Sequence, residues 1–311
     1  MAANRPKLAI NRLRESKELD HQALQLLVDQ HEFPIIEGNQ CTFVAWQQAD
    51  EVFLRHRVVG IRDPLPLRRI EHTDFWYVVL EIPKDSRVEY QIEVRRGEHW
   101  ERFNDPLNPR IARSPVGNSS VCFGQGYEVP DWAVYDPDAR PGELVELMIR
   151  SQAQRRDNRV TLYLPARFTT TQRYPLLVVH DGGDYLEYAS MKVVLDNLIH
   201  RLDMAETVVA FTYPGERLRE YPNSGPHARW TTKELIGQLE EQLPMVAHPS
   251  GRALLGSSFG AIASLTTAVR YPETYGSLLL QSGSFVFTDI GALQGEDPAF
   301  DPVVKFMNRY R

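Results

Sequence analysis

The first half of the chain is dominated by short segments in which apolar and polar residues alternate. In the clearest of them, 87–95, Val88, Tyr90, Ile92 and Val94 alternate with charged or amide side chains. A period of two places the apolar side chains on one face of a β-strand and the polar side chains on the other, wet face. Further aromatic and β-branched strands are predicted at 41–46, 51–59 and 74–82. Short strands at this spacing favour a β-sandwich.

The second half has a different pattern, in which continuous apolar segments alternate with helical ones. Strands are predicted at 160–165, 174–181, 207–214, 252–256 and 275–283. Helices are predicted at 191–202, 231–246 and about 259–270. Strands that are buried on both faces and alternate with helices indicate a parallel sheet covered by helices, so the fold class is predicted to be α/β.

These patterns divide the chain into four parts. Leu19, Leu24 and Leu27 have roughly helical spacing within the segment 15–30, which predicts an N-terminal helix. We expect an N-terminal helical part at 1–30, a β-sandwich domain at 31–126, a proline-rich linker at 127–142 and an α/β domain at 143–311.

Composition narrows the function. The 311 residues carry a formal net charge of −6, so neither nucleic acid nor an anionic membrane surface is an expected partner. No apolar stretch is long enough to cross a bilayer, and we expect a soluble chain without an export signal. The two cysteines, Cys41 and Cys122, exclude a C-x-x-C motif and are expected to be reduced and buried. No metal site and no oligomeric state is predicted.

A motif for nucleophilic catalysis lies between the predicted strand 252–256 and the following helix. Gly256-Ser257-Ser258-Phe259-Gly260 matches G-x-S-x-G in the strand–turn–helix context of a nucleophile elbow. The sharp turn brings backbone segments close together, so the residues two before and two after the serine must lack a Cβ. Ser258 is therefore predicted to be the nucleophile, at a helix N-terminus that favours a developing oxyanion.

A second glycine-rich turn follows the predicted strand 174–181. Such a turn lets a backbone N–H face the site, and we predict that the amides of Gly183 and Phe259 form the oxyanion hole. His180 and Asp181 are interpreted as residues of the strand end and the turn rather than as catalytic groups. Asp184 is expected at the mouth of the site.

Arg217, Arg219 and Arg229 gather in one predicted loop. Guanidinium groups suit carboxylates and catecholate oxygens and stack on aromatic rings, so these three are candidate substrate-binding residues. The alternative is a solvated loop in which Glu216 and Glu220 are their local partners.

The chain resembles the enterochelin (ferric enterobactin) esterase family, within the esterase-D-type α/β-hydrolases. The resemblance rests on the following segments: 74–94, Asp105–Pro109, Gly117–Ser120, Pro130–Trp132, 180–185, Arg217–Tyr221, Glu234–Leu235, Leu243–Pro244, 256–260 and 281–285. It implies an Ig-like (E-set-like) sandwich followed by an α/β-hydrolase domain with a Ser-His-acid triad and no cofactor. The implied substrate is the trilactone ester backbone of a catecholate siderophore, cleaved in the cytoplasm to release iron.

One departure from this pattern is large. The triad order of the fold is serine, acid, histidine, yet the last histidine of the sequence is His248 and none follows Ser258. The segment after Ser282 is about one βα unit long where the fold needs two more strands. We expect a shortened version of a longer enzyme whose sheet lacks its last strands, with weak or no esterase activity in these 311 residues. A pseudo-esterase that only binds its ligand, a relocated base such as His227, and an esterase for other acyl esters such as feruloyl esters are the alternatives.

Overall fold

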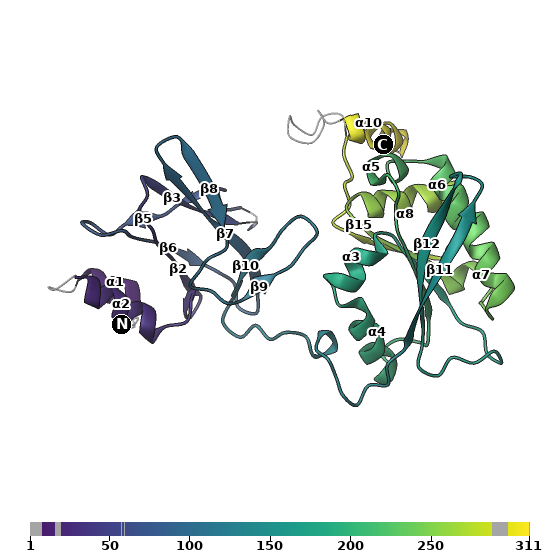
Figure 1. Ribbon diagram of the computed structural model, residues 1–311, viewed down its shortest axis with the longest axis horizontal. Coiled ribbons are helices and arrows are strands. Elements are labelled where there is room, and N and C mark those ends of the chain that lie inside the picture. Colours follow the sequence, from purple (N-terminus) through teal and green to yellow (C-terminus); the bar gives the residue numbers. More distant parts are fainter. Residues whose placement is uncertain (1–7, 16–19, 57, 59, 288–297, 311) are drawn as a thin grey trace. The chain divides into compact units, whose positions relative to one another are not determined.

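The computed structural model describes residues 8–15, 20–56, 58, 60–287 and 298–310 (Figure 1). The chain divides into two compact units, Met1–Val129 and Pro130–Arg311. Each unit has its own apolar core and is described by itself. Within the described residues, no helix has the length and apolar character that a bilayer-spanning segment needs.

The first unit contains two sheets. One has the strand order β1 (Ile35–Glu37), β2 (Gln40–Trp46), β6 (Phe75–Glu81) and β5 (Arg68–Arg69). The other has the order β4 (Leu65–Pro66), β3 (Glu51–His56), β7 (Arg87–Arg96), β10 (Ser119–Phe123) and β9 (Ile111–Ala112), and β8 (His99–Phe103) pairs with β7. Phe43 of β2 and Leu54 of β3 belong to one shared core, so apolar faces of both sheets are buried together. An Ig-like topology of this unit stays a prediction.

Strand β7 departs in one place from the predicted wet and dry faces. Tyr90, Ile92 and Val94 are buried as the alternation predicts, but Glu93 on the opposite face is also buried. Its carboxylate accepts from Arg55 Nε at 2.9 Å and from Arg102 Nη2 at 2.8 Å. Two guanidinium partners offset the desolvation of this charge, which the alternation of residue types could not reveal.

The helix predicted at 15–30 begins later than expected. The structure has α1 (Ala9–Arg14) and α2 (His21–Gln30), and the N–H of Ala23 donates to Asp20 Oδ1 at 2.9 Å. Asp20 therefore caps α2 and sets its start. Leu19 lies outside the described residues. Cys41 and Cys122 are free and buried.

The second unit is an α/β domain, as predicted. Its sheet has the order β11 (Glu143–Ser151), β12 (Arg156–Leu164), β14 (Val208–Thr212), β13 (Leu176–Val179), β15 (Arg252–Ser257) and β16 (Ser277–Gln281). The last four are parallel to one another, whereas β11 and β12 form an antiparallel hairpin of which only β12 was predicted. The helices are α3 (Gly182–Glu187), α4 (Met191–His200), α5 (Arg217–Glu220), α6 (Gly225–Arg229), the π-helix η2 (Trp230–Leu235), α7 (Ile236–Gln242), α8 (Phe259–Arg270) and α10 (Asp301–Met307).

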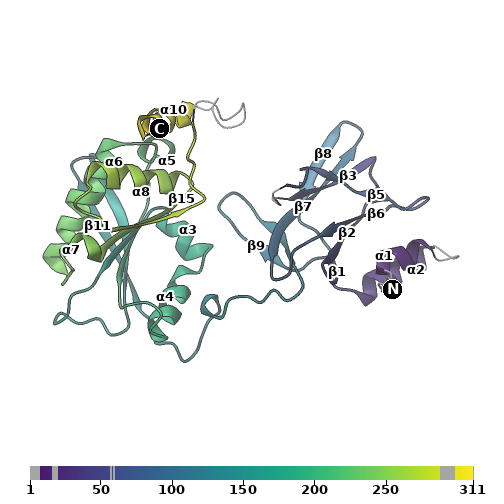
Figure 2. The same ribbon diagram turned by 180° about the vertical axis from the view of Figure 1, so that it is seen from behind.

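The helices cover both faces of this sheet (Figures 1 and 2). Leu235 and Leu239 bury against Val178 on one face, and Leu195 of α4 buries against Leu177 on the other. The helix predicted at 231–246 ends at Gln242, because Leu243 precedes a proline and takes an extended conformation. The last strand, β16, has no further neighbour among the described residues, and its Leu279 is 45% exposed.

Candidate active site

The strand–turn–helix geometry predicted for the elbow is present at the end of β15. Ser258 joins β15 to α8 with φ 54° and ψ −120°, a backbone conformation that is strained for a residue with a side chain. A Cβ at Gly256 would lie 2.2 Å from the carbonyl oxygen of Gly260, so no larger residue fits there. A Cβ at Gly260 would lie 3.2 Å from Asp181 Oδ2. The two glycines thus permit the close approach that the sequence motif implied.

Ser258 itself is half-buried and its backbone is well held. Its N–H donates to the carbonyl of Gln281 at 3.0 Å, and its own carbonyl accepts from Ala261 at 3.1 Å. Its Oγ lies 3.0 Å from Ser284 Oγ. Ser284 is the partner of the hydroxyl among the described residues.

The glycine turn after β13 lies against the start of α8. Asp181 takes a left-handed conformation with φ 54°, and Gly182 and Gly183 open the short helix α3. A Cβ at Gly182 would lie 2.4 Å from Phe211 Cβ, and one at Gly183 would lie 2.8 Å from the ring of Tyr213. Gly182 therefore has no room for a side chain, and a side chain at Gly183 would require the Tyr213 ring to move.

Two backbone donors flank this contact without a partner. The N–H groups of Gly183 and Phe259 have no hydrogen-bond acceptor in the described part of the chain. Both residues lie in the first turn of a helix, where N–H groups have no intrahelical acceptor, so these amides are free to donate to a bound group. The amide of Phe259 also carries the partial positive charge of the N-terminus of α8. These two amides can hold an oxyanion.

The buried carboxylate of Asp181 fixes the glycine turn. It accepts two hydrogen bonds from Arg217, from Nε to Oδ1 at 2.9 Å and from Nη2 to Oδ2 at 2.8 Å. The Asp181 N–H donates to Tyr221 Oη at 3.0 Å, and the Arg217 guanidinium lies 5.9 Å from the centre of the Phe259 ring. Arg217 thus binds Asp181 rather than Glu216 or Glu220. Burial, followed by the charge of Asp181, raises the pKa of half-buried Asp184.

The other two candidate arginines lie in different surroundings. The Arg219 side chain is 82% exposed and pairs with Glu216 at 2.9 Å, as the solvated-loop alternative predicted. Arg229 is exposed at the end of α6. Among the described residues, neither forms a hydrogen bond or ion pair with Ser258 or Arg217.

Two histidines form a buried pair beside the elbow. His180 Nε2 and His227 Nε2 are 2.9 Å apart, and His180 Nδ1 lies 3.3 Å from the carbonyl oxygen of Leu255. Nδ1 also lies 3.0 Å from Ser264 Oγ, whose own proton goes to the Gly260 carbonyl at 2.9 Å. Both neighbours of Nδ1 can therefore accept, so we assign the proton of His180 to Nδ1, and His227 then donates from Nε2. Burial lowers the pKa of His180 to about 4, and burial together with His180 lowers that of His227 well below its usual value.

The histidine pair is relevant to the alternative in which His227 acts as a relocated base for Ser258. His227 is 3% exposed, and its hydrogen-bonded ring nitrogen faces His180 rather than Ser258. Within the described residues no histidine contacts Ser258 Oγ. The downstream aspartates Asp289 and Asp297 lie outside the described residues, and Asp301 is an exposed residue at the start of α10.

Sequence reasoning missed the residues that surround the elbow from other elements. Ser284 contacts Ser258, and Tyr185 Oη donates to Gln281 Oε1, which ties α3 to the end of β16. Helix α10 packs its Val303 into the same apolar cluster as Phe259 and Tyr221. In the sequence, the only signal for Ser284 is its place in the segment 281–285, which belongs to the family resemblance.

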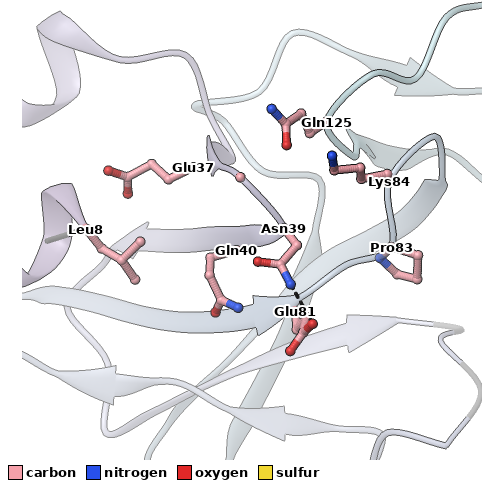
Figure 3. Close-up of a pocket in the computed structure, with 9 residues that line it drawn as sticks. Leu8, Glu37, Asn39, Gln40, Glu81, Pro83, Lys84 and Gln125 are labelled. Atoms are coloured by element: carbon pink, nitrogen blue, oxygen red, sulfur yellow. Dashed lines mark hydrogen bonds between the residues drawn. The ribbon is translucent and has the colours of Figure 1, made fainter. Parts of the chain in front are cut away.

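The first unit has a separate hollow of about 1040 Å³ between α1, the β1–β2 turn and the β6–β7 turn. Figure 3 shows Glu37 and Leu8 on one side and Lys84 and Gln125 on the other. Asn39 donates to Glu81, and Glu37 accepts from the N–H of Ala9. Its lining includes neither a serine nor a histidine, so it is not the candidate esterase site.

A sheet with four parallel strands, helices on both of its faces and a strained serine between strand and helix define an α/β protein of the α/β-hydrolase type. The chain belongs to the putative esterase family, whose sequence profile matches residues 151–306.

Curated relatives agree with this assignment, and solved structures agree with the fold. The chain is 24% identical over 270 residues to the iron(III) enterobactin esterase of Escherichia coli O6:H1, which covers 76% of this chain and 66% of the relative. It is 24% identical to the Dickeya dadantii enzyme of the same name, with 72% and 58% covered. The chain therefore spans less than two thirds of the length of each of these relatives. Among solved structures, enterochelin esterase from Shigella flexneri has a TM-score of 0.66 at 20% identity, with 83% of this chain and 75% of that chain covered.

Proposed function

We propose that the chain is a serine carboxylic-ester hydrolase. Ser258 Oγ attacks the acyl carbon, the amides of Gly183 and Phe259 hold the carbonyl oxygen as it becomes negative, and the ester alkoxide leaves with a proton. Water then releases the acyl group from Ser258. The observation that carries the proposal is the pair of unpaired N–H groups at two contacting turns beside a strained, half-buried serine.

The proton of Ser258 needs an acceptor for this reaction. No histidine contacts Ser258 Oγ among the described residues, so the serine of these 311 residues stays a neutral alcohol. An oxyanion hole alone supports residual catalysis, and we expect weak turnover. The same observation favours a second candidate function, a non-catalytic protein that binds its ligand at this site.

For the substrate we propose a catecholate siderophore with a trilactone ester backbone, in iron acquisition in the cytoplasm. Relatives named iron(III) enterobactin esterase support this choice, as does the likeness to the Shigella flexneri enzyme solved in the presence of enterobactin. Exposed Arg219 and Arg229 would offer guanidinium groups to an anionic, aromatic iron complex. Asp184 would lie at the mouth of the site.

A fluorophosphonate probe tests the enzyme against the binding protein, because the rate at which it labels a serine rises with the activation of that serine. We expect slow labelling of the full 311-residue chain at Ser258, located by peptide mass spectrometry, and none in Ser258→Ala. The adjacent Ser257→Ala variant is the matched control and keeps the label. An unlabelled native chain that still binds ferric siderophore would establish the binding protein instead.

The base and the substrate need separate measurements. His227→Gln is expected to leave labelling unchanged, and loss of labelling in a folded variant would make His227 the base. Hydrolysis of an enterobactin-type trilactone, compared with that of methyl ferulate, tests the substrate. Preference for the feruloyl ester would overturn the siderophore proposal and leave the esterase proposal standing.

A further inference from the structure

The segment Gln281–Ser284 forms a bracket around the nucleophile elbow. Its Gln281 carbonyl accepts from the Ser258 N–H at 3.0 Å, and the Ser284 N–H donates to the Ser258 carbonyl at 3.3 Å. Tyr185 holds the side chain of Gln281, and Ser282 turns the chain with φ 42°. Ser284 is thus positioned against Ser258 by backbone contacts on both sides of the serine. The contact between the two side chains therefore follows from a fixed backbone geometry.

The hydrogen bond between the two serine hydroxyls has a fixed direction during catalysis. Ser284 Oγ lies 3.0 Å from Ser258 Oγ, and at rest either hydroxyl can donate. Once Ser258 gives up its proton, its oxygen can only accept, so Ser284 must be the donor. A hydrogen bond to a charged acceptor is about twice as strong as one between neutral groups. The contact therefore stabilises the alkoxide-like oxygen more than the resting alcohol.

We propose that Ser284 is a further catalytic residue, a hydroxyl donor to the nucleophile oxygen itself. The inference rests on the proposed function and extends it. The amides of Gly183 and Phe259 serve the oxygen of the substrate, whereas Ser284 serves the oxygen of Ser258. With Ser284 donating, the Ser258 proton is also left free to point toward a base. Interactions that strengthen toward the transition state raise kcat rather than lower KM.

A thiol at the nucleophile position tests this donor role without requiring turnover. In Ser258→Cys, the rate of iodoacetamide alkylation as a function of pH reports the thiol pKa, and the native chain with its buried Cys41 and Cys122 provides the background. We expect the pKa of the introduced thiol to be about one unit higher in Ser258→Cys/Ser284→Ala than in Ser258→Cys, a tenfold change in thiolate fraction near neutral pH. Ser284→Thr in the same background keeps a hydroxyl and is expected to restore the lower pKa.

The control is Ser277→Ala, because Ser277 is exposed on β16 outside this segment and has no hydrogen bond to Ser258 among the described residues. An equal thiol pKa with and without the Ser284 hydroxyl, in folded variants, overturns the inference. The fluorophosphonate reaction separates the two proposals. An unlabelled native chain whose introduced thiol still responds to Ser284 contradicts the esterase, whereas a labelled chain whose thiol does not respond contradicts only the role of Ser284.

Discussion

Two neighbouring regions at the same end of the sheet differ in whether their polar groups have hydrogen-bond partners. Around Ser258, backbone donors are left without acceptors, and the serine hydroxyl meets only another hydroxyl among the described residues. Beside it, Asp181 is bound to Arg217 and His180 to His227. The carboxylate and the imidazole, which are the more reactive groups by residue type, thus have hydrogen-bond partners already. We therefore infer the site from the groups whose hydrogen-bonding capacity is unused. Residue type alone would have pointed to the paired carboxylate and imidazole instead.

The difference also separates two structural tasks. The paired region holds the turn that presents Gly183, because Asp181 is fixed by Arg217 and Tyr221. The elbow region keeps a strained serine and unpaired amides that are free to donate to a ligand. Each of the following predictions removes one side of this contrast.

The largest effect is expected from closing the space inside the elbow. In Gly256→Ala the new Cβ would lie 2.2 Å from the Gly260 carbonyl oxygen, so either the turn or the sheet must move. We expect loss of fluorophosphonate labelling and a fall of about 3 kcal/mol or more in the free energy of unfolding of the second unit. Urea unfolding with hydrogen exchange of the β13 and β15 amides measures it.

Gly237→Ala is the matched control for this substitution. A Cβ at Gly237, in α7, meets no atom within 4 Å, and alanine favours the helix by about 0.5–1 kcal/mol. We therefore expect a small gain in stability and unchanged labelling. A Gly256→Ala chain that is as stable as the native one and labels at the same rate would show that the elbow is not tightly packed.

The next effect in size is the response of the histidine pair to acid. Because the folded pKa of His180 is about 4 and that of His227 is well below its usual 6.5, the unfolded chain binds more protons below pH 6.5. The stability from the neutral pair is thus complete above pH 6.5 and is lost as the pH falls toward 4. His180 alone accounts for about 3 kcal/mol of this loss. Asp181 opposes it by favouring the charged imidazole, while Arg217 and Arg156 act in the same direction as burial.

Long-range proton–nitrogen NMR spectra check the histidine pair directly. They should show His180 protonated at Nδ1 and His227 at Nε2, both neutral, in folded protein at pH 5. An imidazolium signal from either residue near pH 6.5, in protein that hydrogen exchange shows to be folded, contradicts the buried neutral pair.

How far the sequence predicted this site depends on how local each signal is. The elbow could be predicted because Gly256, Ser258 and Gly260 lie within five residues between a buried strand and a helix. The α/β class followed from apolar periodicity in the same way. The partner of Arg217 is 36 residues away, and that of His180 is 47 away. Such pairings depend on tertiary packing, so residue spacing predicted an arginine cluster where the structure has one bound and two exposed arginines. Strand β11 was missed because most of its residues are exposed or half-buried and its apolar run is weak.

The smallest effect on stability is expected from the arginines, and it tests the difference between the arginine that is bound to Asp181 and the exposed ones. In Arg217→Ala, Asp181 keeps a buried charge without its guanidinium partner, and we expect a loss of about 2 kcal/mol, reduced from a fully buried pair because Arg217 is partly exposed. Labelling of Ser258 should slow as well, since the turn that presents Gly183 loosens. Arg217→Lys keeps the charge but not the bidentate geometry, so its stability and labelling rate should lie between those of the native chain and Arg217→Ala. Arg219→Ala removes only an exposed pair with Glu216 and should change stability by less than about 0.5 kcal/mol.

Ligand binding then decides what the exposed arginines do. If Arg219→Ala weakens binding of a ferric catecholate siderophore while stability and labelling stay unchanged, Arg219 is a substrate-binding residue and Arg217 is a structural one. If Arg219→Ala binds the siderophore as the native chain does, the exposed arginine belongs to a solvated loop and its binding role is withdrawn. Equal losses of stability in Arg217→Ala and Arg219→Ala would remove the contrast between bound and free groups, because the ion pair with Asp181 would then contribute no more than an exposed one.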